Sequence, residues 1–256
     1  MNKLKKWLRS PAATLVGFAV AAGLLLFSTV GGASAAINDA TNYFGGQIEM
    51  KQIGVSLLEN GDRVSYRDFV ESSDAYSNGS FVSVSGDLLT DLPAEGISVG
   101  KKYPEVLTVK NTGSIGQYVR VTIYKYWRKK GSTDKDTTLS PAMIHVELDN
   151  YGSSWILDES STTPERIVLY YSGRLGDGDE TDPFTKSIML DGSLARKVYQ
   201  EQDPNDSSRI VTKYAYADLE LVLEVQVDAV QDHHASDAMR SAWGVDGADK
   251  GVSISE

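Results

Sequence analysis

Residues 104–127 contain two stretches of alternating side chains separated by a short run of small residues, and this arrangement limits the fold more than any other feature. The apolar positions that recur at every second residue are Leu107, Val109, Val119, Val121 and Ile123. A two-residue period built from β-branched and aromatic side chains is typical of strands that bury one face. Between the two stretches, residues 111–114 read Asn-Thr-Gly-Ser, which suits a tight turn. The sequence therefore predicts a core β-hairpin here.

Other parts of the chain show the same succession of short strands and turns. Residues 59–62 read Glu-Asn-Gly-Asp, a strong turn signal between two alternating segments. Residues 219–230 give the clearest alternation, with apolar side chains at the odd positions and mostly polar ones at the even positions. One face of this strand is expected to be buried and the other wet. Residues 235–243 predict a helix that Gly244 terminates.

These segments predict a mainly β protein, an antiparallel β-sandwich or jelly roll with a short C-terminal helix. Its turn signals recur about every ten residues, and no convincing linker separates one part from another. We expect a sandwich domain over residues 47–243, with a leader at 36–46 before it and a tail at 244–256 after it.

The first 35 residues have the three parts of a secretory signal peptide. Four basic residues precede residue 10, an uncharged run covers 12–30, and small residues follow in an A-x-A arrangement. The residues expected at the cleavage site are Ala33, Ala35 and Ala36. A retained membrane anchor is the alternative, because 19 residues can cross a bilayer. The small-residue exit favours removal, so contact with the membrane is expected only through the signal peptide.

Charge and cysteine content limit the partners of the mature chain. Removing the four basic residues, with no acidic ones among them, takes the formal net charge from −10 to −14. Nucleic acid is a poor partner for such a chain, because phosphate binding requires clustered lysine and arginine. The chain has no cysteine, so disulfides and cysteine-based catalysis are excluded by composition. The expected location is extracellular, with attachment to the cell surface as an option.

No motif for catalysis or for a cofactor stands out. The chain has neither an H-E-x-x-H zinc motif nor a G-x-S-x-G nucleophile elbow. The densest acidic loop offers Asp177, Asp179 and Asp182 as weak Ca²⁺ ligands, although the EF-hand pattern is not met. A glycosidase carboxylate pair stays open as an alternative, because the deciding separation is spatial. A sugar-binding aromatic face is a further alternative to ordinary packing for Tyr118, Tyr124, Tyr126, Trp127, Tyr170 and Tyr171.

Three short segments resemble the TasA/camelysin family of exported Gram-positive proteins. Residues 31–39, Gly-Gly-Ala-Ser-Ala-Ala-Ile-Asn-Asp, are similar to that family's signal exit, which a SipW-type signal peptidase cleaves. Residues 106–114 resemble the family's strand ending in Asn-x-Gly-Ser. Residues 224–231 and the helix ending in Ala-Trp-Gly at 242–244 resemble its closing segment. The resemblance implies a jelly-roll sandwich and, by analogy with the best-understood members, assembly into biofilm matrix fibres.

In such fibres the freed N-terminal segment of one subunit completes a sheet in its neighbour, which is a form of β-augmentation. Carried over to this chain, the donated segment would be Ile37, Asn38, Asp39, Ala40, Thr41, Asn42, Tyr43 and Phe44. The expected function is therefore that of a secreted, non-enzymatic surface or matrix protein without a cofactor. Its expected partners are the signal peptidase during export and further copies of itself. The alternative is an extracellular Ca²⁺- or carbohydrate-binding module.

Overall fold

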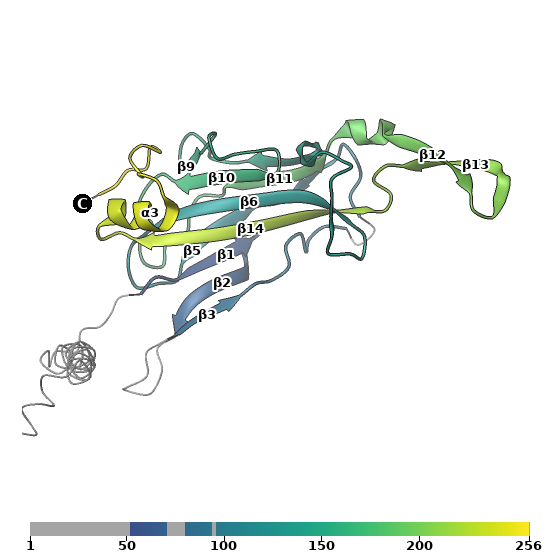
Figure 1. Cartoon of the computed structure of the whole chain (residues 1–256). Coiled ribbons are helices and arrows are strands. Elements are labelled where there is room, and N and C mark those ends of the chain that lie inside the picture. The colour runs from purple at the N-terminus through teal and green to yellow at the C-terminus, as the bar shows by residue number, and fades with distance from the viewer. Residues whose placement is uncertain (1–51, 71–79, 94–95, 256) are drawn as a thin grey trace, which may run out of the picture. The chain divides into compact units, whose positions relative to one another are not determined.

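The computed structural model describes residues 52–70, 80–93 and 96–255 (Figure 1). Lys51–Glu256 group into one compact unit. The predicted signal peptide, its cleavage residues Ala33, Ala35 and Ala36, and the predicted donor segment 37–44 lie outside the described residues. Within the described part, no helix is both long and apolar enough to span a membrane.

The protein is mainly β, and its strands pair antiparallel in two layers (Figure 1). One layer contains a four-stranded sheet in the order β3 (Ser80–Val84), β2 (Asp62–Val70), β1 (Val55–Glu59) and β5 (Leu107–Asn111). The same layer continues with a three-stranded sheet, whose order is β4 (Lys102–Pro104), β11 (Thr185–Leu190) and β8 (Ile144–Leu148). Backbone hydrogen bonds between β5 and the segment just before β11 connect these sheets, among them those from Thr181 N–H to the Val109 carbonyl (2.8 Å) and from Phe184 N–H to the Leu107 carbonyl (3.0 Å).

The second layer is built on the two longest strands. Its order is β14 (Leu219–Gln231), β6 (Gln117–Lys129), β10 (Arg166–Tyr171) and β9 (Trp155–Leu157), and β7 (Lys135–Asp136) also pairs with β6. β14 and β6 are each 13 residues long and pair over their full length, from Leu219 opposite Lys129 to Gln231 opposite Gln117. β14 therefore forms one edge of this layer.

The main core lies between the two layers. Leu57 and Val109 come from the first layer, and Val121, Leu169 and Leu223 come from the second. The mainly β fold of antiparallel sheets is as the alternating sequence predicts, and the packing of two layers is sandwich-like. The 3₁₀ turns η1 (Pro141–Met143) and η2 (Gly192–Arg196) connect strands, and η2 leads into an exposed hairpin of β12 (Val198–Asp203) and β13 (Asp206–Tyr214).

Two local predictions are confirmed. The helix α3 (Ala235–Trp243) has the predicted bounds, and Gly244 terminates it with a φ of 71°, a left-handed conformation that glycine adopts without strain. The turn between β1 and β2 is confirmed as well. Asn60 (φ 52°) and Gly61 (φ 93°) both have positive φ there, as a tight hairpin turn requires.

The predicted hairpin over residues 104–127 is wrong. Both of its strands exist, but β5 pairs with β1 in one layer and β6 pairs with β14 and β10 in the other. The Asn111 side chain stabilises the link between the layers, because its amide donates hydrogen bonds to the carbonyls of Ile115 (2.7 Å) and Gly176 (2.8 Å). The small residues therefore cross the sandwich and do not form a hairpin.

The face of β14 that the sequence predicts to be solvent-exposed is only partly so. A second apolar cluster forms there, where α3 and the chain end cover the sheet (Figure 1). Met239 of α3 is fully buried in it, and Val230 and Val252 are 5% and 4% exposed. Lys250 also pairs with the Asp158 carboxylate at 2.8 Å. Residues 244–255, predicted as a tail, are thus packed into the fold.

Candidate functional site

The strongest candidate for a functional surface is the outer edge of β14 and the groove beside it. The groove has a volume of about 590 Å³. On one side it is lined by residues 221–226 of β14, and on the other by residues 85–89 together with Leu57 and Val64. It therefore opens between the edge of the second layer and the four-stranded sheet of the first.

The backbone of β14 is available for pairing on this side. β14 is the last strand in its sheet, and no described strand pairs with its outer edge. In an antiparallel sheet, alternate residues of an edge strand direct N–H and C=O groups away from the neighbouring strand. A long edge of this kind is a template on which another chain can add a strand.

The apolar face of β14 continues into the groove. Leu223 is 6% exposed, and Leu221 and Val225 are half-buried against the main core. Across the groove, Val64 and Leu88 are also half-buried against that core. An added strand with apolar side chains on one face would extend this core while its backbone paired with β14.

The acidic side chains on the other face of β14 are paired with β6. Glu220 accepts a hydrogen bond from Arg128 (2.7 Å), and Asp228 accepts one from Arg120 (2.8 Å). Glu224 accepts a hydrogen bond from the Tyr126 hydroxyl (2.7 Å), and this bond raises the pKa of that tyrosine. These contacts direct the carboxylates back across the sheet and leave less negative charge at the open edge.

The predicted acidic loop has a different organisation from a metal site. Asp177, Asp179 and Asp182 are all exposed and make separate contacts. Asp179 accepts a hydrogen bond from the Gly176 backbone (3.1 Å), whereas Asp182 accepts one from the Ser154 hydroxyl. Asp177 lies in an open hollow near Arg174. Among residues 52–70, 80–93 and 96–255, no three histidine, aspartate or glutamate side chains are grouped closely enough to hold a metal ion.

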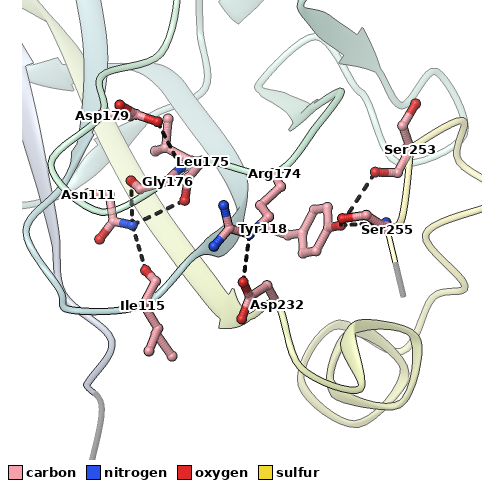
Figure 2. A network of polar contacts seen from close by, with 10 residues as sticks. All are labelled: Asn111, Ile115, Tyr118, Arg174, Leu175, Gly176, Asp179, Asp232, Ser253 and Ser255. Atoms are coloured by element: carbon pink, nitrogen blue, oxygen red, sulfur yellow. Dashed lines mark hydrogen bonds and ion pairs between the residues drawn. The ribbon is translucent and has the colours of Figure 1, made fainter.

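Figure 2 shows that this loop takes part in a network of polar contacts with the segment after β5 and the segment after β14. The Asn111 amide points at the carbonyls of Ile115, Leu175 and Gly176. Arg174 binds Asp232, which follows β14, at 2.6 Å. These contacts join β5, the acidic loop and the end of β14, so a structural role accounts for them.

Four of the six aromatic side chains considered for sugar binding lie in or against the two apolar clusters, and Tyr124 and Tyr126 belong to neither. Trp127 belongs to the main core and is 2% exposed, and its ring nitrogen donates to the Ser140 carbonyl. Tyr118 and Tyr170 belong to the second cluster and are 0% and 2% exposed. Tyr124, Tyr126 and Tyr171 are half-buried. Packing accounts for the three buried rings, which are not available to a sugar.

Two features of the structure are absent from the sequence-based prediction. The groove beside β14 depends on how the two layers lie together, and no sequence signal locates it. A pair of buried glutamates, Glu59 and Glu105, is also new, because Glu59 has the sequence context of an ordinary turn residue. The pairing of β1 with β5, two strands that are distant in sequence, brings these two residues together.

Comparison of the chain with protein-family models, with curated proteins and with solved structures finds no match.

Proposed function

We propose that the chain is an exported, non-enzymatic structural protein of the cell surface or extracellular matrix. It assembles by donating residues 37–44 to the groove beside β14 of a neighbouring copy. The observation that carries this proposal is the 13-residue edge of β14, which has no described strand on its outer side and has a groove beside it. The resemblance to the TasA/camelysin family supplies the donor segment, the jelly-roll topology and the removal of residues 1–35 by a signal peptidase.

The length of the proposed donor segment is compatible with the length of the β14 edge. A strand of eight residues is about 26 Å long at roughly 3.3 Å per residue, which is shorter than a 13-residue strand. The donor segment lies eleven residues or more before β1 in the sequence. Repetition of this head-to-tail contact does not have to close into a ring, and an open series of such contacts is a filament.

The first test compares residues 37–256 with residues 45–256 by negative-stain electron microscopy. Filaments are expected only from the longer version, because the shorter one lacks the donor segment. If filaments form without residues 37–44, the donor mechanism is wrong. If both versions stay monomeric at high concentration, the fibre proposal itself is wrong.

A second test locates the acceptor edge with one matched pair of substitutions. Val222→Lys introduces a charge on β14 beside the groove, at a half-buried side chain that belongs to neither core cluster. Lysine on an edge strand opposes the addition of another strand. We expect this variant to fold and to lose filaments, while Val198→Lys, at a 50% exposed valine on β12, keeps them. Equal behaviour of the two variants would exclude β14 as the acceptor.

A further inference from the structure

The hairpin of β12 and β13 exposes an unusual amount of apolar surface. Four of the seven large apolar side chains that are exposed on the described residues lie on it, and they are Val198, Tyr199, Ile210 and Tyr214. The two strands form a sheet of their own, with which no other strand in the described part of the chain pairs. A lone two-stranded hairpin is only marginally stable in water, so a partner that covers it would also stabilise it.

The register of the hairpin gathers uncharged side chains on one face. Directly opposite residues of an antiparallel pair share a face, and so does every second residue along a strand. Three opposite pairs therefore form one surface of six side chains, which we call the neutral face. The pairs are Val198 with Tyr214, Gln200 with Thr212, and Gln202 with Ile210. All six side chains are exposed, and none of them carries a charge.

The charged side chains of the hairpin are directed elsewhere and pair with one another. Glu201 and Lys213 lie on the opposite face, where they form an ion pair. Arg209 pairs with Asp203 at 3.6 Å. The aspartates at the tip, Asp203 and Asp206, lie beyond a register shift and outside the three pairs of the neutral face. The hairpin therefore satisfies its own charges on one side and presents only apolar, amide and hydroxyl groups on the other.

These properties fit a second copy of the same chain. The chain carries a formal net charge of −10, so two copies repel each other over much of their surface, but the neutral face adds nothing to this repulsion. Its glutamine and threonine side chains each supply both donors and acceptors, so an identical face can satisfy them. A two-fold contact joins the same patch of both copies and requires this kind of self-complementarity.

Tyr214 is held in place before any partner binds. Its ring stacks on that of Tyr216 at 5.2 Å between centroids, and Tyr216 packs against the main core. Side chains that are already ordered lose less conformational entropy on association. Val198 lies directly opposite Tyr214 at the base of the hairpin, and Ile210, which is 69% exposed, lies nearer the tip. The neutral face thus has an apolar group at each end and amide and hydroxyl groups between them.

We propose that two copies of the chain associate through the neutral faces of their β12–β13 hairpins, packed face to face about a two-fold axis. Sheets packed in this way lie about 10 Å apart, so the side chains of each copy cover those of the other. Specific interfaces bury at least about 1,000 Å² in total, and six side chains per copy lie at the lower end of that range. The dissociation constant is therefore expected on the order of 100 µM. This contact is separate from the groove beside β14 and does not depend on export or on fibres.

The test is sedimentation equilibrium of residues 45–256, which contain the whole compact unit and lack the proposed donor segment. Between about 5 µM and about 500 µM, the weight-average mass is expected to rise from that of a monomer toward that of a dimer. Ile210→Lys places a charge in the neutral face and should weaken the association at least about tenfold. Tyr199→Lys is the matched control, because it adds the same charge at a 42% exposed side chain on the opposite face, and it should associate like the unsubstituted chain.

Replacing residues 199–213 with Gly-Gly removes the hairpin and should give a monomer at every concentration, whatever Ile210→Lys does to the hairpin itself. A dimer that persists in this version, or equal association of the two lysine variants, would overturn the proposal. An unsubstituted chain that stays monomeric up to about 500 µM would overturn it as well. Retention on an insoluble neutral glycan, abolished by Ile210→Lys, would then identify a polysaccharide as the occupant of the neutral face.

Discussion

At the scale of single residues, Glu105 gives the protein a pH dependence of unusual sign. Its pKa is raised from 4.5 to about 8 by burial and by the neighbouring carboxylates, so the folded state keeps a proton that the unfolded chain releases. The stabilising contribution of this proton is complete below about pH 4.5 and is lost as the pH rises through about 8. Most paired carboxylates produce the opposite trend.

We therefore expect the free energy of unfolding to fall between about pH 5 and pH 9, by up to about 4 kcal/mol from this group. Glu105→Gln cannot ionise, so its profile should lack this decline and lie above that of the unsubstituted protein at pH 9. Urea unfolding at a series of pH values measures both profiles. Parallel profiles would show that Glu105 titrates normally.

The same residues show how far sequence reasoning reaches at this scale. Asn60 and Gly61 are recognisable as a tight turn, because the local backbone alone decides which residues can adopt a positive φ. Glu59, which precedes them, has the appearance of a solvated turn residue. Its burial against Glu105 follows from the pairing of β1 with β5, and no local pattern encodes that pairing.

At the scale of elements, the period of the sequence identifies strands but not their partners. The helix α3 and the strand β14 lie where alternation and capping residues predict them. The two strands of residues 104–127 are also present, yet they pair in different layers. A turn of small residues suits both a hairpin and a crossing between layers. The choice depends here on long-range contacts, such as that of Asn111 with Gly176.

The hairpin of β12 and β13 is an element that we expect to be dispensable for folding. Several of its large apolar side chains are exposed, with Val198 and Tyr214 at 50% and Ile210 at 69%. A two-stranded hairpin has little stability of its own, and this one adds little to the main core. Replacing residues 199–213 with Gly-Gly should change the free energy of unfolding by less than about 1 kcal/mol.

Chemical unfolding measures this change, with Leu194→Ala as the comparison. Leu194 lies in η2, directly before the hairpin, and is fully buried in the main core. Its truncation is expected to cost about 2–5 kcal/mol. A comparable loss on removal of the hairpin would mean that the hairpin packs on the sandwich in solution.

At the scale of the whole molecule, the two apolar clusters share the same strands. On β6, Tyr118 belongs to the second cluster while Val119 belongs to the main core, and on β10, Val168 and Leu169 are divided in the same way. The sheet of β14, β6 and β10 is therefore held from both faces. The loss of either cluster exposes apolar surface on strands that the other cluster needs, which favours one cooperative transition.

Met239→Ala tests this coupling, because Met239 is fully buried and packs only in the second cluster. We expect a loss of about 2–5 kcal/mol that appears equally in every probe of unfolding. In residues 37–256 carrying Trp243→Phe, the remaining tryptophans are Trp127 and Trp155, both in the main core. Their fluorescence should report the same lowered midpoint as far-ultraviolet circular dichroism. If the tryptophan midpoint stays unchanged while α3 melts earlier, the clusters unfold independently, and the chain end is a separate element on a self-sufficient sandwich.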